Sequence, residues 1–97
     1  MGAERALADW HDIVRYLHVL DAGSDRLVVE ELGPTTMGNP YLLVTVSAPE
    51  TIRDLPRHRA QQRRLADPRT TGPVEAAHIA REEKAVLLMT ASVHSNE

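Results

Sequence analysis

The chain has no cysteine and no phenylalanine among its 97 residues. The lack of cysteine excludes disulfides, thiolate zinc ligands and a cysteine nucleophile, so any site chemistry must come from histidines, carboxylates and hydroxyls. Aromatic side chains are limited to one tryptophan and two tyrosines, which means that a core must be built from aliphatic residues. A chain of this length forms one small domain with a modest buried surface. We therefore expect a single domain over residues 1–97.

A strong net charge and a long apolar run are also missing. The formal net charge of -3 gives no general reason to expect a nucleic acid or an acidic membrane as partner. The longest apolar stretch, AVLLMTASV, is far too short to span a bilayer. Charged residues near the N-terminus, Glu4, Arg5 and Asp9, leave no room for a signal peptide. We expect no nucleic-acid partner, no membrane partner and, by default, a cytoplasmic location.

The first half of the chain has the pattern of a helix followed by a hairpin. Apolar residues recur at three- and four-residue steps over residues 3–20, which predicts an amphipathic helix that stops before Gly23. Residues 26–32 and 41–46 are rich in β-branched and aliphatic side chains and predict two strands. The segment GPTTMGNP between them carries two glycines and two prolines, so the strands are expected to form an antiparallel hairpin.

The second half predicts two helices and then a buried strand. The segment SAPE, residues 47–50, has the spacing of a capping box, with Ser47 placed to cap a helix. A short turn and a main helix over residues 56–66 should follow, and a further helix is expected over residues 74–83. The continuous apolar run AVLLM, residues 85–89, is typical of a central strand covered on both faces. This order predicts an α/β fold.

The chain ends on a histidine and a glutamate three residues apart, His94 and Glu97. Open α/β sheets place their ligands beyond the carboxyl ends of the strands, and these two residues follow the expected central strand. An imidazole and a carboxylate on one turn provide two of the three protein ligands that a catalytic zinc ion needs. The same spacing also occurs by chance, often on a frayed tail.

Two longer segments carry a resemblance to a known family. KAVLLMTASVHSNE is similar to the part of the zinc metallocarboxypeptidases, the carboxypeptidase A family, in which a hydrophobic strand leads into a His-x-x-Glu turn. LVVEELGPTTMGNPYLLVTVS resembles the first hairpin of that family, and HRAQQRRLADPR resembles a connection seen in its bacterial members. The resemblance covers most of the chain. It implies the N-terminal part of a mixed-sheet α/β zinc-carboxypeptidase fold, made of a helix, a β-hairpin, two helices and a central strand.

The resemblance also implies a function. It makes His94 and Glu97 zinc ligands and assigns no catalytic residue to this chain, because the family's third ligand, substrate-binding arginines and general base come later in its sequence. The expected activity of the complete enzyme is the removal of C-terminal residues from peptides, with zinc as cofactor and a peptide with a free C-terminus as substrate. The 97 residues by themselves are expected to be a truncated, inactive segment that binds zinc weakly or not at all.

Two other functions remain open. A zinc amidohydrolase or deacylase of the aspartoacylase type also uses His-x-x-Glu, although the hairpin favours the peptidase. A non-enzymatic interaction module would instead use the arginine-rich stretch, although no aromatic residue lies among the arginines to stack on bases. A solvated helix face is the simpler interpretation of that stretch. The arginine-rich stretch contains Arg53, Arg57, Arg59, Arg63, Arg64 and Arg69.

Overall fold

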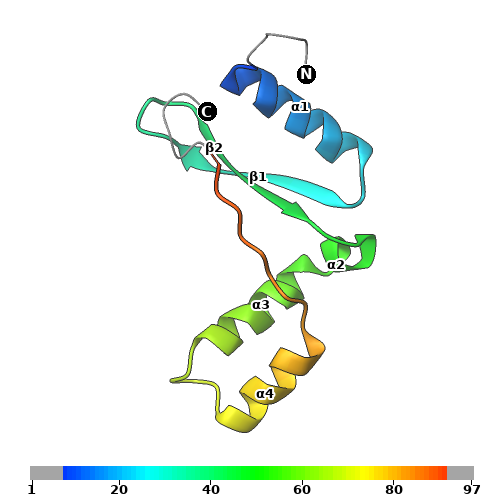
Figure 1. The fold of residues 1–97 in the computed structure, drawn as a ribbon, viewed down its shortest axis with the longest axis vertical. Coiled ribbons are helices and arrows are strands. Elements are labelled where there is room, and N and C mark those ends of the chain that lie inside the picture. The colour runs from blue at the N-terminus through cyan, green and yellow to red at the C-terminus, as the bar shows by residue number, and fades with distance from the viewer. Residues whose placement is uncertain (1–7, 92–97) are drawn as a thin grey trace. The chain divides into compact units, whose positions relative to one another are not determined.

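The computed structural model describes residues 8–91, and residues 1–7 and 92–97 lie outside the described part. The chain divides into two compact units, Met1–Leu55 and Pro56–Glu97. The described residues form helices and a two-stranded antiparallel sheet, so the molecule belongs to the general α/β class (Figure 1). The more specific carboxypeptidase fold and the single domain stay predictions.

The first unit begins with helix α1 (Trp10–Gly23). Asp9 caps it, because a side-chain oxygen of Asp9 accepts a hydrogen bond of 2.8 Å from the backbone N–H of Asp12. The predicted start of this helix was therefore wrong at residues 8 and 9, which precede the first turn. The predicted end was also wrong, because the helix continues to Gly23 instead of stopping before it.

Strands β1 (Leu27–Pro34) and β2 (Pro40–Val46) form the predicted antiparallel hairpin. Val29 lies opposite Val44, and the register shifts between Glu31 and Gly33. In the turn, Gly38 has φ +79° and donates its N–H to the carbonyl of Thr35 over 2.9 Å. A side chain at this φ would be strained, so the turn depends on glycine here.

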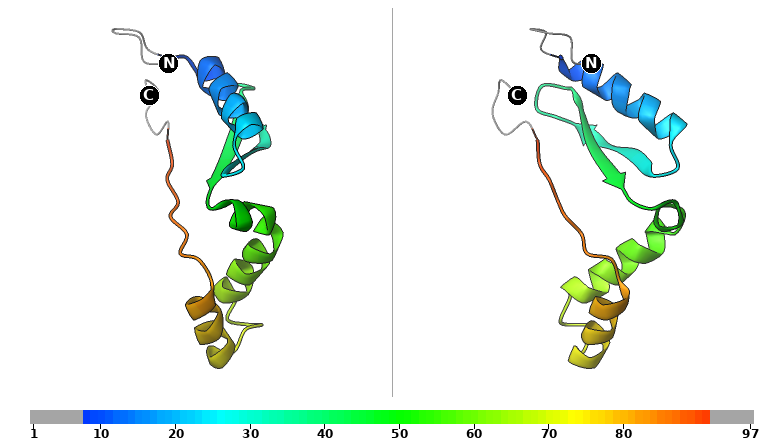
Figure 2. Two further views of the ribbon diagram at one scale, coloured as in Figure 1. Left: turned by 90° about the vertical axis from the view of Figure 1, so that its right-hand side faces the viewer. Right: turned by 45° about the vertical axis from the view of Figure 1, so that its right-hand side comes forward.

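Helix α1 packs along β1 in the first unit (Figure 2). The indole Nε1 of Trp10 donates a hydrogen bond of 3.1 Å to the carbonyl of Pro40, which ties the first turn of α1 to the start of β2. Helix α2 (Pro49–Arg53) follows the hairpin, and Ala48 is its N-cap, without a side-chain hydrogen bond. The predicted cap at Ser47 was wrong because proline at the first helical position places the cap one residue later.

The second unit contains α4 (Pro73–Glu82) and all but the first residue of α3 (Leu55–Ala66), and both helices lie close to the two that the sequence predicts. Their connection is tightened by the backbone N–H of Thr71, which donates to the carbonyl of Asp67 over 3.1 Å. Among residues 8–91, Ile79 on α4 is the only buried apolar residue. The described part of the chain thus has a very small core, and polar contacts carry much of the α3–α4 pairing.

The predicted central strand at residues 85–89 is not formed. Residues 84–91 are extended and belong to no strand (Figure 1). A strand needs a neighbour to satisfy its backbone N–H and C=O groups, and in residues 8–91 only β1 and β2 pair with each other. The prediction of a buried central strand is therefore wrong within the described residues, where the run is exposed and has no neighbouring strand.

Candidate functional site

The two metal ligands suggested by the sequence, His94 and Glu97, lie outside the described residues. The structure describes the segment that leads towards them. Four consecutive apolar side chains of that segment are between 74% and 85% exposed: Val86, Leu87, Leu88 and Met89. Contiguous exposed apolar side chains are uncommon on soluble proteins and mark surfaces that another element covers.

The described histidines do not form an alternative metal site. His11 and His18 are exposed on α1, and His78 is exposed on α4. Within residues 8–91, no group of three or more histidine, aspartate or glutamate side chains is placed to hold a metal ion. The zinc proposal therefore depends on His94 and Glu97.

A buried carboxylate in the second unit joins α3 to the end of α4. The side chain of Glu83 is only 5% exposed, and its Oε1 lies 2.7 Å from Nη1 of Arg57. Its Oε2 lies 2.6 Å from Nδ1 of His58, whose side chain is 15% exposed. One residue further, the carbonyl of Lys84 accepts a hydrogen bond of 3.0 Å from Nε2 of Gln62. These contacts hold the chain at the point where the apolar segment begins.

The hydrogen bond from His58 lowers the pKa of Glu83 below its ordinary value of 4.5. Burial of the carboxyl acts in the opposite direction, and the hydrogen bond and charge of Arg57 lower the pKa further. Near neutral pH, Glu83 is therefore an anion between two nitrogen donors.

An imidazole held by a carboxylate at 2.6 Å resembles the orienting pair of a general base. A general base also needs a free second nitrogen within reach of a substrate. In this unit, Nη2 of Arg57 lies 3.1 Å from Nε2 and 3.4 Å from Nδ1 of His58, so the guanidinium group lies close to both ring nitrogens and restricts access of a substrate to Nε2. The geometry therefore favours a structural role for the cluster formed by Arg57, His58 and Glu83, which we call the Glu83 cluster.

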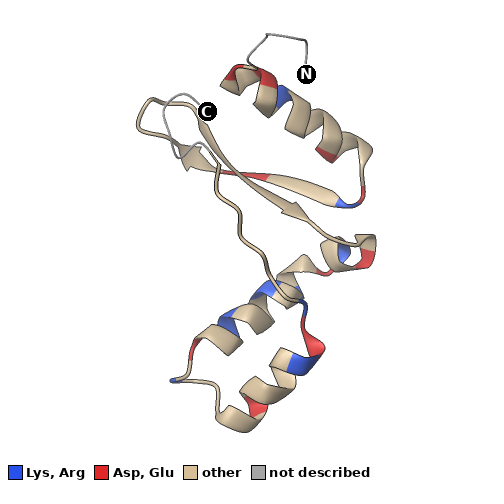
Figure 3. Ribbon diagram, viewed as in Figure 1, with Lys and Arg blue, Asp and Glu red and all other residues tan. Residues whose placement is uncertain are grey.

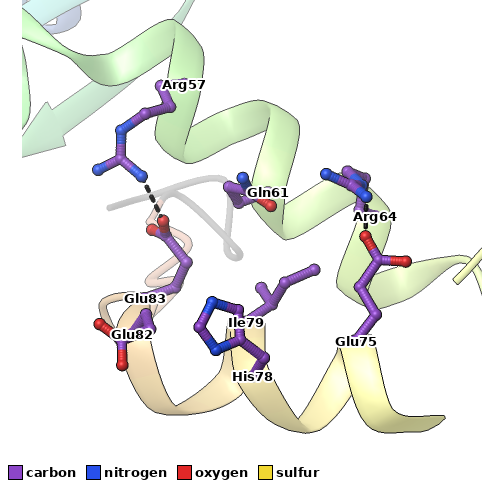
Figure 4. Close-up of a pocket in the computed structure, with 8 residues that line it drawn as sticks. All are labelled: Arg57, Gln61, Arg64, Glu75, His78, Ile79, Glu82 and Glu83. Carbon is purple, nitrogen blue, oxygen red and sulfur yellow. Dashed lines mark hydrogen bonds and ion pairs between the residues drawn. The ribbon is translucent and has the colours of Figure 1, made fainter. Parts of the chain in front are cut away.

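A cleft of about 330 Å³ opens beside this cluster between α3 and α4 (Figure 4). At its other end Arg64 forms an ion pair with Glu75. Near the middle, Oε1 of Gln61 is buried without a hydrogen-bond partner. Arg57 and Arg64 are both engaged by carboxylates, so the cleft does not present a concentrated charge to a ligand. Its lining residues are Arg57, Gln61, Arg64, Glu75, His78, Ile79, Glu82 and Glu83.

The arginine-rich stretch is partly neutralised by acidic neighbours. Basic residues lie along α3, and acidic residues lie on α4 and in the connections (Figure 3). Arg57 and Arg64 pair with glutamates of the α4 segment, and Arg69 binds Asp67 through its Nε at 2.8 Å. This pairing favours the interpretation of a solvated, ion-paired helix face over an electrostatic surface for a nucleic acid.

The Glu83 cluster was missed in the interpretation of the sequence. His58 and Glu83 are 25 residues apart, and no local periodicity connects them. The available signal was the pair of neighbouring helices with a short connection, because such helices run antiparallel and bring the start of one to the end of the other. Pairing opposite charges across that arrangement would have suggested the contact between Arg57 and Glu83.

In residues 8–91, no helix is long and apolar enough to cross a membrane. Comparison of the chain with protein-family models, with curated proteins and with solved structures found no match.

Proposed function

We propose that residues 1–97 are the N-terminal part of a zinc metallocarboxypeptidase catalytic domain, with His94 and Glu97 as its first two zinc ligands. The motif resemblance is one support. The observation that carries the proposal further is the exposed apolar run at residues 86–89, directly before the His-x-x-Glu segment. Such a run is suited to a strand with neighbours on both sides and layers above and below it.

The donor chemistry of the two residues fits zinc. Histidine nitrogen and glutamate oxygen are both common zinc ligands, and a His₂Glu set is known for carboxypeptidase A. His94 and Glu97 supply one nitrogen and one carboxylate, so a second histidine has to come from the rest of the domain. When bound, zinc supplies Lewis-acid polarisation of the scissile carbonyl. The role of this chain's residues is to hold the ion and to orient it towards that carbonyl.

The test uses a polypeptide extended past Glu97 through a third ligand and the remaining substrate-binding residues. It should bind zinc in a one-to-one ratio and remove C-terminal residues from peptides. His94→Ala should abolish both properties, because two ligands do not hold a catalytic zinc ion. His78→Ala is the matched control, since His78 is exposed on α4 and should not affect zinc content.

The outcomes separate the candidate functions. Full peptidase activity in the His94→Ala variant would rule out the proposed ligand. Zinc-dependent hydrolysis of N-acyl amino acids without cleavage of peptides would reassign the protein to the aspartoacylase type. The 97-residue chain alone should show no C-terminal trimming of peptides.

A further inference from the structure

Methionines are the side chains of this protein that mild oxidants reach most easily. The chain has no cysteine, so no thiol competes with them for a peroxide. Two of the three methionines lie in the described residues, and both are exposed, Met37 at 85% and Met89 at 82%. Trp10, the one tryptophan, is half-buried and donates its indole N–H to the hairpin. Oxidation of residues 8–91 by peroxide is therefore directed to Met37 and Met89.

The two methionines have different surroundings. Met37 lies in the turn of the hairpin, between Thr36 and Gly38, and a surface turn has no apolar face to bury. Met89 is the last of four consecutive exposed apolar side chains, residues 86–89, in a segment of extended backbone. Oxidation at Met37 therefore changes only a turn, whereas oxidation at Met89 changes a member of the apolar run.

Hydrogen peroxide converts a methionine thioether into a sulfoxide. A lone pair of the sulfur attacks one peroxide oxygen, an S–O bond forms and the O–O bond breaks. The other oxygen leaves as hydroxide, takes the proton from the transferred oxygen and becomes water. The sulfur loses two electrons, and the peroxide gains them. The product carries a polar oxygen that accepts hydrogen bonds, and burial of such a group without a donor is unfavourable.

We propose that Met89 is an oxidation-sensitive site whose sulfoxide prevents the apolar run from being buried as a strand. Until the run is covered, its exposed thioether is open to peroxide. After oxidation, the run carries a polar group where the layers on either side of a central strand require apolar contacts. The inference rests on the proposed function for those layers, whereas the oxidation step does not depend on zinc. Met37 is the matched site, because it is nearly equally exposed and lies outside the run.

The first test treats the 97-residue chain with hydrogen peroxide and follows each methionine by mass spectrometry of its peptides. Because susceptibility follows exposure, Met37 and Met89 should gain oxygen at rates that agree within about threefold. A slower rate at Met89 would overturn the proposal, because its thioether would then be covered already.

The second test uses the polypeptide extended past Glu97, oxidised in denaturant and then refolded. Oxidation should lower its folding equilibrium constant by about tenfold or more, measured by thermal unfolding with circular dichroism. Met89→Leu keeps an apolar side chain of similar volume and should remove most of this loss, whereas Met37→Leu should leave the loss unchanged. Equal stability of the oxidised Met89→Leu variant and the oxidised unsubstituted polypeptide would refute the proposal.

Zinc content and peptidase activity of the unoxidised polypeptide report the proposed function separately. A polypeptide that folds without binding zinc would reject that function, and the comparison with Met89→Leu would still decide whether Met89 controls burial of the run. An unoxidised polypeptide that does not fold would reject both.

Discussion

Truncation of Ile79 tests how much the small core of the second unit contributes to the stability of that unit. Ile79 is 4% exposed, and Ile79→Ala removes three carbon atoms from a nearly fully buried site. At about 0.8 kcal/mol per buried methylene, the lost transfer free energy is about 2.4 kcal/mol. The gain in helix propensity on going to alanine offsets at most about 0.7 kcal/mol. Because Ile79 lines an open cleft, neighbouring groups and water can fill the space, which limits any additional cavity term.

The net destabilisation expected for Ile79→Ala is therefore about 2 kcal/mol, which is large for a small protein and corresponds to about a 30-fold change in an opening equilibrium. Native-state amide hydrogen exchange in α3 and α4 measures this directly, residue by residue. The amides of both helices should exchange about 30-fold faster in the variant. A more conservative change, Ile79→Val, should cost about 1 kcal/mol.

The matched control is Val74→Ala on the same helix, where the side chain is 83% exposed. Substitutions at exposed positions change stability by less than about 0.5 kcal/mol, so exchange in α3 and α4 should be nearly unaffected. Equal acceleration in the Ile79 and Val74 variants would refute the assignment of Ile79 as the core of this unit.

Two further predictions concern single polar contacts. Trp10→Phe removes the indole donor to the carbonyl of Pro40 and should destabilise the α1–hairpin unit by about 1 kcal/mol. Hydrogen exchange in α1 and β2 measures this loss, and unchanged exchange would show that the 3.1 Å hydrogen bond contributes nothing to stability. Because the pKa of Glu83 is lowered in the folded state, the ionised carboxylate stabilises the fold fully above pH 4.5, the ordinary pKa of a glutamate. This stabilisation is lost as the pH falls through the lower pKa of the folded state. Glu83→Gln should therefore flatten the acid limb of the stability curve below pH 4.5, followed by circular dichroism, and an unchanged limb would contradict the ion pairs seen with Arg57 and His58.

The elements that could be predicted from sequence are those with a strong local cause. The hairpin follows from two β-rich runs and a turn in which Gly38 adopts φ +79°. Helix boundaries were less accessible because several residues compete for each cap. Asp9 and not the apolar period decides where α1 begins, and Pro49 moves the cap of α2 from Ser47 to Ala48. The choice depends on backbone geometry that a spacing rule does not contain.

The candidate sites show the same division between local and long-range causes. The proposed metal motif could be recognised because its two residues lie only three positions apart in the sequence, whereas the Glu83 cluster depends on the pairing of two helices. The pairing of α3 with α4 buries the Glu83 carboxylate and also brings the side chains of Arg57 and His58 within hydrogen-bond distance of it. A charged residue at the end of a polar helix gives no indication that its side chain will be 5% exposed.

The apolar run at residues 85–89 shows the limit of composition as evidence for structure. Its side chains specify that burial is favourable, and each large apolar group contributes about 1.5–3 kcal/mol when fully covered. Composition does not specify which backbone supplies the hydrogen bonds of a strand, and an unpaired buried N–H or C=O costs a comparable amount. The run therefore becomes a strand only where a sheet edge and covering layers are present together. In the described residues, the Glu83 cluster and the contact of Gln62 with Lys84 fix the point from which that run departs.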